Sequence, residues 1–237
     1  MNLKSTLIAM PSLNNNDRIR QIADALGELN ACVVYVGGAV IQLYSTDKAA
    51  GSPTTTYDVD CVVDITSYRE YQEFEGKIRE KHFSNDTSEG APICRYLFNG
   101  EKVDFMPKVD TGIGESNRWY LKGLAYRQKY RLDEKRTIFI MPVSFYLASK
   151  LEALHDRGGE DYRGAKDFED IVYVLNTCVN LSEEICAVED NEVRDYLRNE
   201  FRALLERTNI LEEVSCALLE EGRTDHVMDA VRQIANS

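Results

Sequence analysis

The apolar residues of the chain follow two spacings, and each spacing predicts one kind of element. Short runs of β-branched and aromatic residues predict strands at 33–36, 57–60, 93–98, 101–107 and 137–141. Apolar residues three or four positions apart predict helices at about 14–30, 67–81, 119–130, 142–156, 182–188, 193–206, 211–219 and 225–234. This order predicts an α+β fold, in which a mixed β-sheet flanked by helices precedes a helical C-terminal region.

Two strand-to-turn junctions stand out in this pattern. Gly37-Gly38 ends the first strand, and residues 39–44 have the composition to begin a helix. A glycine pair would let a phosphate approach the unpaired backbone amides at this turn. Asn99-Gly100 separates the third and fourth strands, which predicts a tight β-hairpin.

Three aspartates interrupt the strands. Asp58 and Asp60 are two residues apart, so both side chains point to one face of their strand. Two close carboxylates repel each other unless a cation lies between them, which favours a divalent metal such as Mg²⁺; a solvated strand end is the alternative. Asp104 lies in the second strand of the hairpin, where it either pairs with Arg95 or completes a three-carboxylate site.

Together these motifs resemble the DNA polymerase β nucleotidyltransferase superfamily, which has two small residues, a D-x-D pair and a third aspartate. Residues 150–157 (KLEALHDR) and 166–171 (KDFEDI) are similar to the signature of the AbiEii/AbiGii (MenT-like) toxin nucleotidyltransferases. The resemblance spans about 33–175. The spacing from Gly38 to Asp58 exceeds the family's usual dozen or so residues, so we expect an inserted loop at 46–56 beside the site.

The resemblance implies a nucleotidyltransferase fold and a Mg²⁺-dependent transfer of a nucleoside monophosphate from an NTP to a hydroxyl group. It implies that Asp58, Asp60 and Asp104 are catalytic residues that hold two Mg²⁺ ions. The nucleotide would contact residues on both sides of a cleft, namely Gly37, Gly38, Lys150, Lys166, Asp167 and Asp170.

The residues themselves leave alternatives for the last four positions. Lys150 lies near the edge of a buried helix face, where a lysine stem often covers apolar surface without any ligand. Asp167 and Asp170 share a helix face with Lys166 close by, an arrangement that surface ion pairs alone also explain.

Three acceptors or roles compete. A toxin-type enzyme would modify tRNA or another RNA and could have a cognate antitoxin protein. A small-molecule enzyme would modify an aminoglycoside-type substrate, and a regulator would bind nucleotide without turnover. Residues 119–136 combine basic and tyrosine side chains and are a candidate RNA contact, although a solvated helix face gives the same pattern.

Composition limits these choices. The chain has 237 residues, 43% hydrophobic, and a net charge of −12, which opposes non-specific nucleic-acid binding. No apolar run reaches the length of a membrane span, residues 1–12 do not resemble a signal peptide, and the six scattered cysteines fit reduced thiols. We therefore expect a cytoplasmic protein, with a catalytic domain at 1–140 and a helical domain at 141–237.

Overall fold

The computed structural model describes residues 13–47, 51–114, 117–218, 220 and 222–237. Residues 1–12, which we interpreted as lacking a signal peptide, residues 48–50 of the expected insertion and Leu219 at the end of a predicted helix lie outside this part. Within the described residues, no helix is both long and apolar enough to cross a bilayer.

A seven-stranded mixed sheet forms the centre of the N-terminal part, with the strand order β3-β4-β5-β2-β1-β7-β6. The strands are β1 (Val33–Val36), β2 (Asp58–Val63), β3 (Ser84–Asn85), β4 (Arg95–Phe98), β5 (Glu101–Pro107), β6 (Gln128–Arg131) and β7 (Thr137–Ile140). Strand β2 pairs with β5 and β1 with β7 in parallel, and the other neighbours are antiparallel. The predicted α+β class with a mixed sheet is confirmed.

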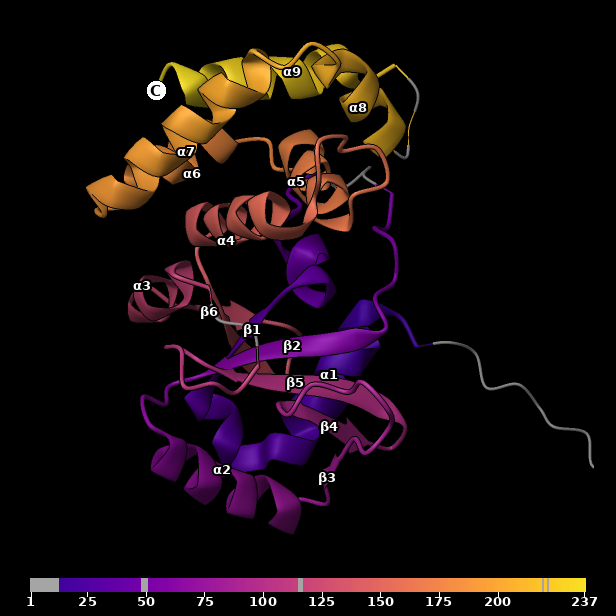
Figure 1. The fold of residues 1–237 in the computed structure, drawn as a ribbon, viewed down its shortest axis with the longest axis vertical. Coiled ribbons are helices and arrows are strands. Elements are labelled where there is room, and N and C mark those ends of the chain that lie inside the picture. The colour runs from indigo at the N-terminus through magenta and orange to yellow at the C-terminus, as the bar shows by residue number, and fades with distance from the viewer. Residues whose placement is uncertain (1–12, 48–50, 115–116, 219, 221) are drawn as a thin grey trace, which may run out of the picture.

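Helices α1 (Asn15–Leu26) and α2 (Tyr68–Glu80) bury their apolar stripes. On α2, the Tyr71 hydroxyl donates a hydrogen bond to the carbonyl of Phe105. The Phe74 ring packs edge-on against the Phe105 ring, with 5.3 Å between their centroids. Ser67 caps α2, because its hydroxyl accepts a hydrogen bond from the Glu70 amide. Helix α2 therefore covers the face of β5 that is opposite to Asp104 (Figure 1).

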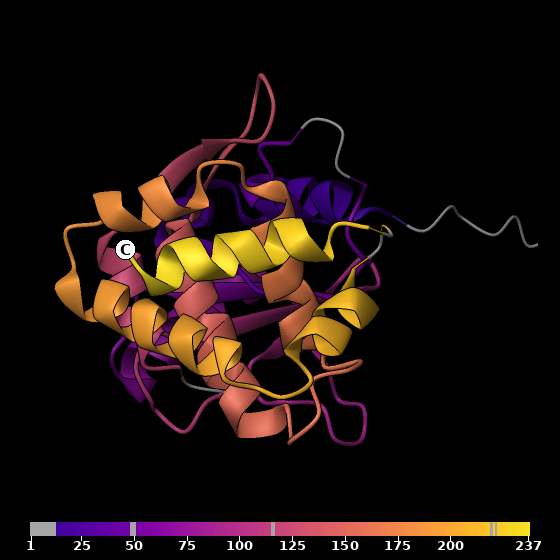
Figure 2. The same cartoon turned by 90° about the horizontal axis from the view of Figure 1, so that it is seen from above.

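The remaining helices form the other part of the molecule. They are α3 (Trp119–Ala125), α4 (Val143–Arg157), α5 (Lys166–Thr177), α6 (Leu181–Ala187), α7 (Asn191–Leu205), α8 (Ile210–Ala217) and α9 (Thr224–Ala235). Helix α4 packs on α3, α5 and α7, and Figure 2 shows α7 and α9 side by side above this layer. The predicted helical C-terminal region is confirmed, whereas the domain division at 140/141 stays a prediction.

Three local predictions were wrong. Helix α1 ends at Leu26 and not near residue 30, because the left-handed Gly27 begins a 3₁₀ segment to Cys32. The helix predicted at 119–130 ends at Ala125, because residues 128–131 pair with β7 as an edge strand. Tyr68, whose spacing with Tyr71 and Phe74 predicts a place on the buried stripe of α2, is 59% exposed. The helix expected after Gly37-Gly38 is present as a seven-residue 3₁₀ helix at Gly38–Tyr44.

Candidate active site

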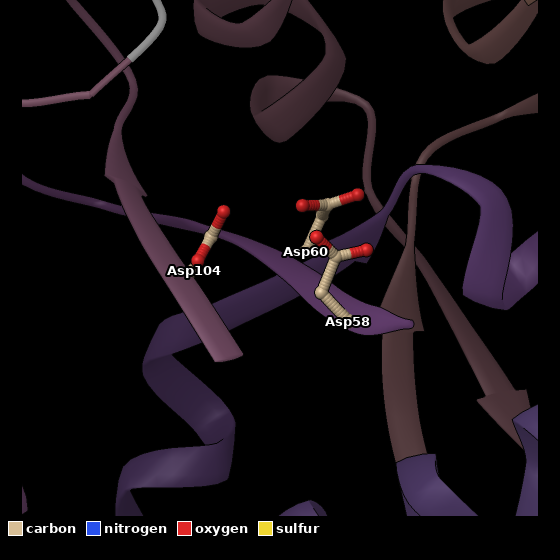
Figure 3. A group of neighbouring side chains, drawn as sticks. All are labelled: Asp58, Asp60 and Asp104. Carbon is tan, nitrogen blue, oxygen red and sulfur yellow. The ribbon is translucent and has the colours of Figure 1, made fainter. Parts of the chain in front are cut away.

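The three predicted aspartates come together on one face of the sheet. Asp58 and Asp60 lie two residues apart on β2, and the parallel register places Asp60 beside Asp104 of β5. Each carboxylate offers an oxygen within 4.8 Å of the other two, and Figure 3 shows the three groups side by side. Hard divalent cations bind oxygen ligands, so three carboxylates at this spacing fit such a cation.

Electrostatics support the same interpretation. Burial and, after it, the charges of Asp58 and Asp104 together raise the pKa of Asp60 to about 7. Burial, followed by the charge of Asp104, also raises the pKa of Asp58. Negative charge on these carboxylates is only partly compensated by neighbouring cations, so the cluster would gain from an additional positive charge.

Arg95 contacts two of these aspartates. Its Nε donates to Asp104 Oδ1 at 2.7 Å, and its Nη2 donates to Asp104 Oδ2 at 2.7 Å and to Asp58 Oδ2 at 2.9 Å. These hydrogen bonds raise the pKa of Arg95 above its ordinary value. The two alternatives for Asp104 are therefore both realised, because it pairs with Arg95 and also completes the three-carboxylate cluster.

The glycine pair makes room for neighbouring side chains. Gly37 has a φ of +68°, and a Cβ at this position would lie 2.8 Å from Asp60 Cγ. A Cβ on Gly38 would collide with the methyl group of Thr56 and lie 3.6 Å from Asp170 Oδ2. The structure thus explains both glycines by the close approach of protein groups. Phosphate binding at their amides stays a prediction.

A second charged cluster faces the carboxylates from α4 and α5. Lys150 Nζ lies 3.0 Å from Asp167 Oδ1 and 2.7 Å from Asp170 Oδ2. Lys166 Nζ lies 3.1 Å from Asp170 Oδ1, and Arg157 Nε lies 2.8 Å from Asp167 Oδ2. The two helices therefore hold three cations around two buried carboxylates.

The pKa directions in this cluster follow from its pairing. Burial lowers the pKa of Lys150, but the charges of Asp170 and Asp167 outweigh this effect and raise it overall. Burial raises the pKa of Asp167, but the charges and hydrogen bonds of Lys150 and Arg157 outweigh it and lower the pKa. Lys150 and Asp167 thus stabilise each other's charged form.

One cavity of about 790 Å³ connects the two clusters. Its lining includes all the catalytic and nucleotide-binding residues predicted from the sequence, namely Gly37, Gly38, Asp58, Asp60, Asp104, Lys150, Lys166, Asp167 and Asp170. Three carboxylates and Arg95 lie on the sheet side, and three cations with two carboxylates lie on the side of α4 and α5. The volume lies within the range of small-molecule sites in proteins.

Other lining residues were not predicted as site residues. Residues 54–57, in and next to the expected insertion, line the cavity, and the Thr56 hydroxyl donates to the Asp58 carbonyl at 2.8 Å. Asn117 precedes α3 and no motif marks it, whereas Tyr120 of α3 belongs to the tyrosine-rich stretch that was interpreted as a candidate RNA contact. Arg95 could be found from the hairpin, because counting back from Asn99-Gly100 places it opposite Asp104.

The basic stretch at 119–136 differs from the predicted RNA contact. Lys122 lies 3.1 Å from Asp190 and also contacts Glu192, and Arg136 pairs with Asp24 and Asp133. The aromatic residues are also engaged, since Trp119 is buried and Tyr126 stacks on Phe145 at 5.3 Å. Intramolecular ion pairs and core packing therefore explain most of this pattern.

No family model and no curated protein matches the chain. Among solved structures, the chain is similar to the solution structure of the antibiotic-resistance factor ANT(2'')-Ia, with 16% identity and a TM-score of 0.46. The similarity covers 79% of this chain and 92% of that one.

Proposed function

We propose that the protein is a Mg²⁺-dependent nucleotidyltransferase that transfers a nucleoside monophosphate from an NTP to an acceptor hydroxyl. The observation that carries this proposal is the cavity between two charged clusters. One wall is net negative, with three aspartates and Arg95, and the other is net positive, with three cations around Asp167 and Asp170. Nucleotidyl transfer needs both groups, because it requires metal ions at the reacting phosphate and cations that neutralise the leaving pyrophosphate.

Each cluster has a role in this proposal. Asp58 and Asp60 would hold two Mg²⁺ ions, and Asp104 would hold one of them and accept the proton of the attacking hydroxyl. The bound ions would supply charge neutralisation at the transferred phosphate and would lower the pKa of the hydroxyl. The amides of Gly37 and Gly38 would lie along the triphosphate.

Lys150, Lys166 and Arg157 would bind the phosphates. Lys166 and Arg157 are about half exposed, whereas Lys150 is buried between Asp167 and Asp170. In this arrangement the two aspartates position the three cations, all of which line the cavity. Asp167 and Asp170 would therefore contribute to nucleotide binding through the basic residues that they orient.

Two classes of acceptor fit the proposed reaction. The resemblance to the AbiEii/AbiGii toxins favours tRNA or another RNA, with a cognate antitoxin as a further partner. The ion pairs of Lys122 and Arg136 reduce the charge available for RNA and favour the second candidate, a small cationic acceptor of the aminoglycoside type. The net charge of −12 would also attract such a substrate.

The experiment combines pure protein, Mg²⁺ and each labelled NTP with either total tRNA or a panel of aminoglycosides. Label in tRNA that is lost in Asp104→Asn supports the toxin-type enzyme, and label in the small molecule supports the second candidate. Nucleotide binding without transfer to either acceptor would favour the non-catalytic regulator. Absence of metal-dependent nucleotide binding would contradict the proposed site.

A further inference from the structure

The Arg95 guanidinium contacts two of the three carboxylates of the cluster. It makes three hydrogen bonds of 2.7–2.9 Å, which engage both oxygens of Asp104 and one oxygen of Asp58. Asp104 is only 7% exposed, and the Arg95 side chain is 19% exposed. Such a bidentate contact is a strong arginine–carboxylate arrangement, and it compensates part of the negative charge of the cluster.

The same oxygens are those that a metal ion would use. Mg²⁺ binds carboxylate oxygens at about 2.0–2.1 Å and requires a nearly octahedral arrangement of its ligands. A guanidinium that donates to both oxygens of Asp104 would lie within a few ångströms of that ion and repel it. Arginine cannot relieve the repulsion by losing a proton, because its guanidinium stays charged in proteins. The side chain must therefore move.

The structure gives Arg95 room to move. Residue 95 is the first of β4, and its backbone is fixed by hydrogen bonds from its amide to the Pro92 carbonyl and from the Asp86 amide to its own carbonyl. The side chain lines the cavity, next to Asp58 and Asp104. Rotation of the side chain into the cavity would release the carboxylates while the strand keeps its place.

We propose that Arg95 is a positioning residue that occupies the metal site of the metal-free protein and is displaced when a divalent cation binds. This inference rests on the proposed function, since it assumes that the carboxylates bind metal. Arg95 would hold Asp58 and Asp104 together before metal arrives. Metal could bind only those molecules in which Arg95 has moved away, so the apparent metal affinity would be the intrinsic affinity multiplied by their fraction.

Arginine-detected NMR tests the displacement directly. In metal-free protein, the Arg95 Nε–H should give a signal with slow hydrogen exchange, because it donates to Asp104 at 2.7 Å. Arg95→Lys assigns the signal by its loss. Mg²⁺ without nucleotide should abolish its slow exchange while the amides of β2 and β5 shift. If the signal keeps its slow exchange when the amide shifts are saturated, the displacement is contradicted.

Metal affinity gives a second, independent readout. Mn²⁺ titration should show roughly tenfold or greater tightening in Arg95→Gln, since the competing cation is gone. Arg95→Lys keeps the charge but not the bidentate contact, so it should also bind more tightly than wild type. If Arg95→Lys and wild type bind Mn²⁺ with equal affinity, the tightening in Arg95→Gln is an effect of charge alone, and the inference is contradicted.

A matched control separates this role from a structural ion pair. Arg207 makes a bidentate contact with buried Glu213 far from the carboxylate cluster, so Arg207→Gln should lower the melting temperature equally with EDTA or Mg²⁺. Arg95→Gln should lower it with EDTA and recover with Mg²⁺. If wild type and both Arg95 variants bind no Mn²⁺ and show no Mg²⁺-induced shifts, the metal site of the proposed function is itself wrong, and this inference falls with it.

Discussion

Asp60 lies against the backbone of Gly37, and this contact determines where one of the three carboxylates can lie. The glycine adopts a φ of +68° and a ψ of −162°, a region that is essentially restricted to glycine and that costs another residue about 1–3 kcal/mol of backbone strain. A methyl group would also meet the Asp60 carboxylate. Gly37 therefore acts on the site through sterics, independently of any contact with a nucleotide.

We expect Gly37→Ala to lose Mn²⁺ affinity by roughly 10–100-fold, because a displaced Asp60 no longer completes the cluster. Gly90→Ala is the matched control, since Gly90 has a φ of +80° and nothing within 4 Å of its Cβ position. It also introduces a side chain at a positive φ, so it should lose some stability in chemical denaturation and keep wild-type affinity in calorimetry. Tight Mn²⁺ binding by Gly37→Ala would contradict the steric role.

Lys150 shows what the sequence can and cannot predict about a single residue. Its place near a buried helix face follows from the apolar residues before it. The sequence alone predicts a partly exposed lysine, yet Lys150 is only 9% exposed, because Asp167 and Asp170 of the next helix surround its ammonium group. Burial of this kind depends on how α4 and α5 pack, which local patterns do not encode.

We expect Lys150→Met to lower the free energy of unfolding by about 2–3 kcal/mol, because two buried carboxylates lose their shared cation and each keeps only one half-exposed partner. Lys166→Met removes a half-exposed partner of the same Asp170 and should cost less than about 1 kcal/mol. Guanidinium denaturation at pH 7 measures both. A similar small loss in the two variants would show that the Lys150 pairs are weak.

At the scale of elements, local patterns predict the strands around the site well. The Asn99-Gly100 turn fixes the hairpin register, and both residues have positive φ, as a tight turn requires. Strand β6 was missed because its side chains are mostly exposed and basic, which is typical of an edge strand and indistinguishable from a helix end in sequence. Its assignment depends on pairing with β7.

The loop before β2 is another element whose position the sequence leaves open. Asn15 of α1 is buried and accepts a hydrogen bond from the Thr56 amide at 3.1 Å. Tyr173 of α5 donates to the Gly51 carbonyl at 3.0 Å from the other side. These contacts anchor the segment 51–57, of which residues 54–57 line the cavity, so we infer that α1 and α5 set the shape of its rim.

We expect Asn15→Ala to speed hydrogen exchange at the Thr56 amide and to lower stability by about 1 kcal/mol, the typical contribution of one hydrogen bond. Asn14→Ala is the neighbouring control. It removes the N-cap contact to the Asp17 amide and should weaken α1 by a similar amount without exposing Thr56. Mass-spectrometric exchange of the 51–57 segment distinguishes the two, and equal exchange in both variants would contradict the anchoring role.

At the scale of the whole molecule, the buried carboxylate of Glu213 connects α8 to the segment between α4 and α5. Glu213 is 1% exposed, accepts two hydrogen bonds from Arg207 and a third from the Tyr162 amide at 3.2 Å. The hydrogen bonds from Arg207 lower the pKa of Glu213 in the folded protein. Its stabilising effect is therefore complete above the unfolded pKa of about 4.5 and is lost as the pH falls through the lower folded value.

We expect Glu213→Gln to cost about 3 kcal/mol at pH 7, with the difference from wild type shrinking below about pH 4. Denaturation curves from pH 3 to pH 7 measure this trend. Glu212→Gln removes an exposed partner of Arg163 and should stay within about 0.5 kcal/mol of wild type at every pH. A constant difference for Glu213→Gln across this range would contradict the linkage.

The strand order has a consequence for the order in which the chain folds. Arg95 and Asp104 belong to one hairpin, nine residues apart, whereas Asp58 and Asp60 join Asp104 only through the parallel pairing of β2 with β5. Local pairings close short loops and form early, whereas distant ones close long loops and form later. We therefore expect pulse-labelled hydrogen exchange to show β4–β5 protected before β2. In that case Asp104 acquires its arginine partner before the other two carboxylates arrive, and the repulsion of a bare acidic cluster never has to be overcome during folding.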